Sequence, residues 1–112
     1  MDIGDIYTVE IPPSNGHEQA GVRPAIIMQA EQFETRLPTV LLVPLTSQLR
    51  ARGFPGTVSV HPDAENHLVS ESVALAFQLR AIDKRRLKSP IGRLSTVDLA
   101  NVRNLIKQLI QL

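Results

Sequence analysis

The chain has 112 residues, of which 43% are apolar, and a formal net charge of +1. This length predicts a single domain spanning residues 1–112, with one core that needs neither a metal nor a disulfide. The absence of cysteine excludes a disulfide framework and a cysteine-based zinc site. No signal-peptide pattern is present, and no apolar run approaches the ~20 residues of a membrane span, so we expect a cytoplasmic protein without membrane contact.

The first half of the chain reads as three strands. Residues 4–11 alternate, with Tyr7, Val9 and Ile11 on one side, which predicts a half-buried strand that Pro12 and Pro13 end. A polar loop, residues 16–24, precedes an apolar strand at residues 25–29. The next strand, residues 39–44, is apolar without alternation, which indicates burial on both faces in the middle of a sheet.

The second half adds shorter strands and a helix. Residues 49–56 mix arginine, glycine and proline and predict a mobile basic loop. We expect strands at residues 57–60, 72–82 and 90–94, separated by a polar connection at 61–70 and a basic turn at 83–88. From Ser95, an N-cap candidate with Asp98 as capping-box partner, apolar residues recur every three or four positions, as in an amphipathic helix. The fold class is therefore mainly β with one C-terminal helix, in which five or six strands form a small curled sheet or barrel.

Charge is unevenly distributed despite the small net value. Residues 1–34 contain six acidic side chains and one basic side chain, Arg23, whereas residues 76–112 contain eight basic and two acidic side chains. A basic half of this kind offers a surface for phosphate groups or for an acidic partner. Ordinary solvated charge is the alternative explanation.

Residues 16–24, read as GHEQAGVRP, concentrate chemically capable groups in one loop. His17, Glu18, Gln19 and Arg23 supply an imidazole, a carboxylate, a carboxamide and a guanidinium, and the apolar strand that follows would hold the arginine rigidly. A fixed arginine suits an anionic ligand. A polar loop with no function is the simpler alternative for such a segment.

Five segments, in order and at matching spacing, resemble the MazF/PemK-like (Kid-like) family of toxin endoribonucleases. Besides GHEQAGVRP they are GDIYTVEI, VPLTSQ, SVALAFQLRAIDKRRL and IGRLS, which together cover nearly the whole chain. The resemblance implies an SH3-like barrel of the CcdB/MazF type that forms a homodimer. It also implies a toxin of a type II toxin–antitoxin system, a sequence-selective endoribonuclease that needs no metal or other cofactor and is neutralised by a cognate antitoxin.

The same resemblance assigns catalytic residues. The family's catalytic arginine and threonine fall on Arg23 and Thr46, and Glu18 and Gln19 match loop residues that order the site. RNA can be cut without a metal when its own 2′-OH attacks the adjacent phosphate, and the enzyme then stabilises the anionic phosphorane. Arg23 suits that charge, and the hydroxyl of Thr46 can donate to a phosphate oxygen. Capping of a strand end is the alternative role of Thr46.

The proton acceptor stays open. His17 has an unperturbed pKa near neutrality and is one candidate, and Glu18 is another. The family commonly has an acidic residue where this chain has Phe77, and PemK-type relatives have an arginine where it has Leu75. This departure removes one general base, so reduced activity or a changed sequence preference is an open alternative.

Binding of single-stranded RNA is expected to be mainly electrostatic, with Phe54 as the one aromatic placed to stack on a base. An acidic antitoxin segment would match the same basic surface. The rival function is that of a CcdB-like toxin, which binds DNA gyrase without enzymatic activity, and an inactive remnant is a third reading. The residues expected to contact RNA are Gln19, Ser47, Gln48, Arg50, Arg52, Phe54 and Arg80.

Overall fold

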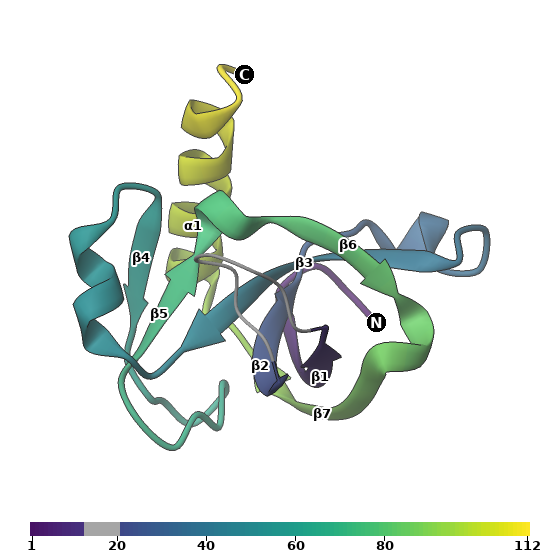
Figure 1. Ribbon diagram of the computed structural model, residues 1–112, viewed down its shortest axis with the longest axis horizontal. Coiled ribbons are helices and arrows are strands. Elements are labelled where there is room, and N and C mark those ends of the chain that lie inside the picture. Colours follow the sequence, from purple (N-terminus) through teal and green to yellow (C-terminus); the bar gives the residue numbers. More distant parts are fainter. Residues whose placement is uncertain (13–20) are drawn as a thin grey trace.

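The computed structural model describes residues 1–12 and 21–112, which form strands joined by short 3-10 helices and closed by one α-helix (Figure 1). Three strands come from the first half of the chain: β1 (Asp5–Ile11), β2 (Gly21–Ile27) and β3 (Thr39–Thr46). The second half contributes β4 (Thr57–Val60), β5 (Ser72–Leu75), β6 (Arg80–Asp83), β7 (Leu87–Arg93) and the helix α1 (Thr96–Leu109). The four 3-10 helices of the described residues are η1 (Glu31–Phe33), η2 (Leu49–Gly53), η3 (Ala76–Gln78) and η4 (Lys84–Arg86).

The strand β3 lies at the centre of an antiparallel sheet with the order β4-β5-β3-β2-β1-β7. On the edge opposite β2, β3 has two successive partners: β6 pairs with its first half and β5 with its last two residues. The predicted central position of this strand is confirmed. Because η4 joins β6 to β7, the two ends of the run β7-β1-β2-β3-β6 lie close together, and the sheet is curled, as expected for the predicted barrel class.

Alternating residues of these strands build a core on each face of the sheet. On one face Ile6, Ile26 and Val43 pack with Val102 of α1, and all four side chains are fully buried. On the other face Val9, Ile11 and their cross-strand neighbours pack inside the curl, with Tyr7 against them. The alternation predicted for β1 is therefore confirmed, because a strand places successive side chains on opposite faces.

The helix α1 begins as the sequence predicts. The hydroxyl of Ser95 accepts a hydrogen bond from the backbone N–H of Asp98 at 3.1 Å, which satisfies one of the free amides of the first turn. Figure 1 shows the helix standing beside β4 and β5, with its free end projecting from the body of the protein.

Four expectations about the elements were wrong. The strand expected over residues 72–82 is two strands, because η3 interrupts it where β3 changes partner from β5 to β6. Residues 49–53 form the 3-10 helix η2 rather than an irregular loop. The strand expected at residues 25–29 begins at Gly21 instead, so that Arg23 lies in β2; Pro24 is tolerated because β3 pairs with β2 only from Ala25 onward. The strand expected at residues 90–94 begins at Leu87 instead, within the predicted basic turn. Division of the 72–82 strand brings the number of strands in the described residues to seven, close to the five or six expected.

Candidate active site

Arg23 and Thr46 lie on neighbouring strands at the same end of the sheet. The antiparallel register of β2 and β3 ends at the pair Ala25 and Pro44, two residues from Arg23 on one strand and two residues from Thr46 on the other. Paired strands are about 4.8 Å apart, so this last pair brings the ends of the two strands near each other. The two residues are 23 positions apart in sequence, and the pairing of their strands unites them.

A cavity of about 190 Å³ opens beside Arg23. We call it the Arg23 cavity. Its described lining comes from residues 22–24 of β2, from Leu45 and Ser47 at the end of β3, and from residues 68–70 and 72. Arg23 is its only charged described lining residue, and Val22 and Val69 are exposed at 64% and 101%. The cavity thus combines one cation, serine hydroxyls and two exposed apolar side chains.

The hydroxyl of Thr46 is held in place from within the chain. Thr46 is buried, and its Oγ1 accepts a hydrogen bond from the backbone N–H of Gln48 at 3.1 Å. Thr46 therefore does cap the end of β3, which is the alternative role considered for it in the sequence. The oxygen uses a lone pair in this bond, so its proton is still available for donation. Ser47, which is exposed and lines the Arg23 cavity, offers a second hydroxyl.

The connection between β4 and β5 forms one wall of the Arg23 cavity, which the sequence did not predict. Asn66 is fully buried, and its side-chain oxygen accepts hydrogen bonds from the N–H groups of Asp63 and Leu68 at 3.0 and 2.9 Å. The Asn66 amide donates to the carbonyl of His61 at 2.8 Å. These bonds fix the backbone that presents Val69 to the cavity. The only local signal was the cluster of polar residues typical of a structured turn.

The expected RNA contacts in η2 and at its two ends lie outside the Arg23 cavity. Arg50 donates to the side chain of Gln48 at 3.3 Å, and Arg52 donates to the carbonyl of Leu49 at 3.2 Å. Phe54 packs against Phe77, with ring centroids 5.8 Å apart and planes inclined by 41°. Position 77 thus supplies an aromatic contact in this chain rather than a carboxylate.

Comparison with known proteins identifies the family. Residues 2–110 match the model of the PemK-like, MazF-like toxins of type II toxin–antitoxin systems. This chain belongs to that family. It is 33% identical to the Endoribonuclease MazF of Staphylococcus saprophyticus over 106 residues, which cover 95% of this chain and 88% of the relative.

Solved MazF structures share the fold. The crystal structure of MazF (Form-I) from Deinococcus radiodurans has a TM-score of 0.83 and 29% identity, covering 100% of this chain and 97% of that one. The MazE-MazF structure (Form-II) from the same organism has a TM-score of 0.75 and 27% identity, covering 100% and 96%. The predicted class, a MazF/PemK-type toxin endoribonuclease, and the predicted fold are confirmed.

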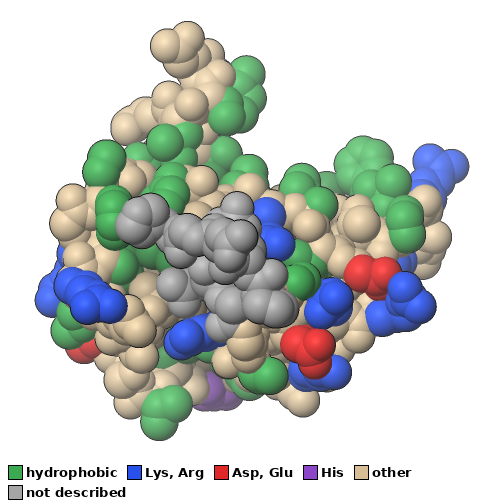
Figure 2. Space-filling model, viewed as in Figure 1, with side chains coloured by type: hydrophobic (Ala, Val, Ile, Leu, Met, Phe, Trp, Pro, Cys, Tyr) green, Lys and Arg blue, Asp and Glu red, His purple; other side chains and the backbone are tan. Residues whose placement is uncertain are grey.

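Basic side chains of this MazF/PemK-family toxin are spread over the face drawn in Figure 2, and two groups of them stand out. One group lies beside β4 and the other between β6 and β7, where acidic side chains lie among them. Arg80 of β6 is half-buried, and one terminal nitrogen of its guanidinium is buried.

Three of the predicted site residues, His17, Glu18 and Gln19, lie outside the described residues. Within residues 1–12 and 21–112, no three His, Asp or Glu side chains cluster closely enough to hold a metal ion. In the same part of the chain, no helix is long and apolar enough to span a membrane.

Proposed function

We propose that this toxin cuts single-stranded RNA at selected sequences in the cytoplasm, without a metal ion, and that residues 1–112 act as one toxin domain. The observation that carries the proposal is the position of Arg23 in a cavity bordered by the end of β3, where Thr46 and Ser47 follow each other. A guanidinium beside fixed hydroxyls is the arrangement that phosphoryl chemistry without a metal requires.

In the proposed reaction the 2′-OH of one nucleotide attacks its own 3′ phosphate, and the 5′ oxygen of the next nucleotide leaves. The products are a 2′,3′-cyclic phosphate and a 5′-hydroxyl. Arg23 binds two non-bridging oxygens through parallel hydrogen bonds, which strengthen as negative charge accumulates on the phosphorane. The backbone pairing of β2 with β1, which sets Arg23 opposite Val9, supports the rigidity that this role needs.

The hydroxyls at the end of β3 provide further donors. Because the N–H of Gln48 already donates to Thr46 Oγ1, the hydroxyl proton of Thr46 is directed away from that amide, toward a phosphate oxygen in our proposal. Ser47 contacts the RNA from the cavity wall. Glu18 and His17 are both candidates for the proton acceptor, and we propose that Glu18 and Gln19 help to order the site.

We propose that the remaining RNA contacts lie outside the Arg23 cavity. Arg50 and Arg52 of η2 attract phosphates, and Arg80 adds positive charge at the start of β6. Gln48 binds RNA together with Arg50, to which it is already hydrogen-bonded. Phe54 is 46% exposed, so one face of its ring can stack on a base while it packs against Phe77.

The test is incubation of the purified protein with unstructured RNA in the presence of EDTA. We expect cleavage that leaves cyclic phosphate ends. Replacing Arg23 by Ala should lower the rate by roughly a hundred- to a thousand-fold, equivalent to ~3–4 kcal/mol, by analogy with the loss of an oxyanion donor. Lysine at this position should recover only part of the activity, since it cannot form the bidentate contact.

Two outcomes would refute the proposal. Near-unchanged cleavage by a folded Arg23→Ala protein would remove Arg23 from the mechanism. Loss of activity with EDTA would indicate a metal-dependent nuclease. An intact RNA substrate combined with inhibition of DNA gyrase would favour the CcdB-like alternative, and inactivity in both assays would favour a remnant.

A homodimer and an acidic antitoxin complete the proposed function. Exposed apolar side chains at the end of α1, Leu109 at 45% and Ile110 at 58%, are surface that a second copy can cover. Light scattering at micromolar concentration should give the mass of two chains. The MazE-MazF structures of Deinococcus radiodurans support an antitoxin partner, and the basic groups of Figure 2 suit an acidic segment.

A further inference from the structure

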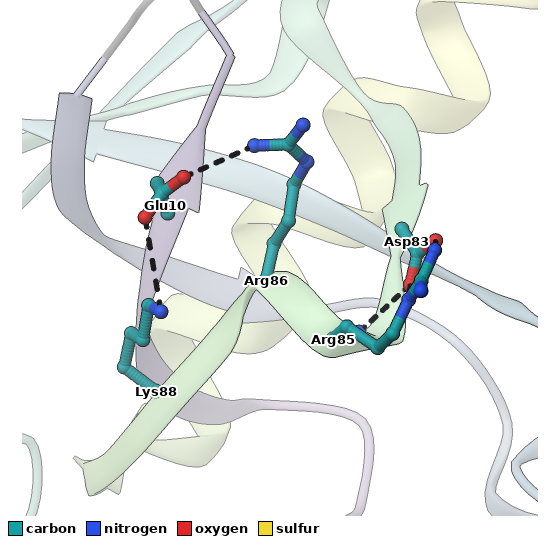
Figure 3. Close-up of a pocket in the computed structure, with 5 residues that line it drawn as sticks. All are labelled: Glu10, Asp83, Arg85, Arg86 and Lys88. Carbon is teal, nitrogen blue, oxygen red and sulfur yellow. Dashed lines mark hydrogen bonds and ion pairs between the residues drawn. The ribbon is translucent and has the colours of Figure 1, made fainter.

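A second charged pocket lies two strands away from Arg23, at the same end of the sheet. We call it the Arg86 pocket; it has a volume of about 320 Å³ and is lined by Glu10, Asp83, Arg85, Arg86 and Lys88 (Figure 3). Its residues come from β1, the end of β6, η4 and the start of β7. Its basic residues belong to the basic half of the chain, but none of them was named individually as an expected RNA contact.

The register of the sheet connects this pocket with the Arg23 cavity. Val22 lines the cavity, and its cross-strand partner on β1 is Glu10, which lines the pocket. On the other side of β1, Val9 pairs with Leu87, which places Arg86 beside Glu10. With strands about 4.8 Å apart, β7 is roughly 10 Å from β2. The pocket and the cavity therefore lie at the same end of the sheet and are linked through the pair Glu10 and Val22.

The Arg86 pocket contains more basic side chains than carboxylates to pair with them. Glu10 lies between Arg86 and Lys88 and forms ion pairs with both, at 3.3 and 3.7 Å (Figure 3). Asp83 is engaged by Arg85 at 2.8 Å. Hydrogen bonds from the Arg85 side chain lower the pKa of Asp83 to about 2, so this carboxylate stays charged at neutral pH. Three cations face two anions, which leaves one positive charge, the complement of one phosphodiester.

We propose that Arg86 and Lys88 form a second phosphate-binding subsite for the RNA, next to the scissile phosphate at Arg23, and that Glu10 occupies it as a substitute anion when RNA is absent. The proposal rests on the proposed function. An RNA strand with one phosphate at Arg23 necessarily carries flanking phosphates close by. A partner protein has no such reason to match this spacing, so the position of the pocket favours RNA over an acidic peptide.

The subsite predicts opposite effects for two substitutions in one pocket. Replacing Arg86 and Lys88 together by Gln removes the two phosphate contacts, so RNA binding should weaken. Replacing Glu10 by Gln removes the competing anion, so RNA binding should become tighter. All three side chains are at least 38% exposed, and exposed ion pairs contribute little to stability, so the variants should stay folded. A general loss of structure would weaken RNA binding and cannot also make it tighter in one of the variants.

The measurement is fluorescence anisotropy with a single-stranded RNA that carries 2′-O-methyl groups and cannot be cut, over a range of salt concentrations. Loss of two phosphate contacts on a single strand should reduce the slope of log K against log salt by about 1.4. A matched control is the pair Arg103→Gln and Lys107→Gln, exposed on α1, which removes the same charge elsewhere. We expect a smaller change of slope for this control.

Several results would overturn the subsite. One is a slope of log K against log salt for the Arg86 and Lys88 double variant that equals the slope of the control. Another is a Glu10→Gln protein that binds RNA no more tightly than the parent. Weaker binding of poly-glutamate with unchanged RNA binding would assign the pocket to an acidic protein instead. These results leave the proposed function intact when the parent protein cuts RNA. A parent protein that neither binds nor cuts RNA would refute the proposed function itself.

Discussion

Replacing Gly92 by Ala should destabilise the protein strongly, although it adds only one methyl group. Gly92 lies in β7 under the connection between β4 and β5. A Cβ at this position would lie 2.5 Å from the carbonyl oxygens of both Glu65 and Asn66, closer than any real contact. Both neighbours are backbone atoms. They can move only if the segment that lines the Arg23 cavity moves with them.

The loss of stability follows from the contacts that break when the backbone at Glu65 and Asn66 moves. Overpacking typically costs about 1–3 kcal/mol. The shift would also lengthen the hydrogen bond from Arg93 N–H to the Glu65 carbonyl, now 3.0 Å, and disturb the bonds of Asn66, for about 1 kcal/mol more. The sum, about 2–4 kcal/mol, corresponds to a fall in Tm of roughly 8–16 °C for a domain of this size.

Thermal unfolding followed by circular dichroism measures this difference. Gly53→Ala is the matched control, because an added Cβ there meets nothing within 4 Å, and its Tm should stay close to that of the parent. A Gly92→Ala protein that melts within about 2 °C of the parent would refute the reasoning. It would mean that residues 61–70 yield easily and do not form a fixed wall of the cavity.

Three further predictions concern the site, the helix and one carboxylate. Thr46→Val should slow the cleavage step more than it weakens RNA binding, whereas Thr46→Ser should retain most activity; single-turnover rates and anisotropy separate the two effects, and equal losses in Val and Ser variants would contradict a role of the hydroxyl. Ser95→Ala should lower the free energy of unfolding by about 1 kcal/mol, measured in urea, because the amide of Asp98 loses its acceptor. The hydrogen bonds from Arg85 lower the pKa of Asp83 from 3.8 to about 2, so the stability they provide is complete above pH 3.8 and is lost as the pH falls toward 2. The stability difference between the parent and Asp83→Asn should shrink over that interval, and a constant difference would show that the pair contributes nothing.

Local patterns in the sequence predicted those elements whose packing is periodic. The alternation around Val9 identified β1 and its buried face, and the spacing from Ser95 onward identified α1 with its cap. The break at η3 gave no such signal, because residues 76–78 contain neither glycine nor proline. It arises from β3, which is long enough to pair with two strands in succession along one edge.

One part of the candidate site was predictable from the sequence, and the other part was not. Motif resemblance pointed to Arg23 and Thr46, and the pairing of β2 with β3 explains how two positions distant in the sequence come to the same end of the sheet. The wall formed by Val69 and Ser70 was not predicted. Its position depends on the buried Asn66 and on the space left by Gly92, contacts between segments that no local pattern reveals.

The central position of β3 also constrains how this toxin becomes active during synthesis. The partners of β3 extend from Gly21 to Asp83, so its two edges are covered only when most of the chain is present. Pairing between distant segments is slow, since the entropy of closing long loops is lost before the contacts form. Arg23 and Thr46 can meet early through β2 and β3, but the cavity wall and the second edge of β3 are added later. A growing chain on the ribosome should therefore be harmless until β6 has emerged, and until then the open edge of β3 is a surface for chaperones or for aggregation.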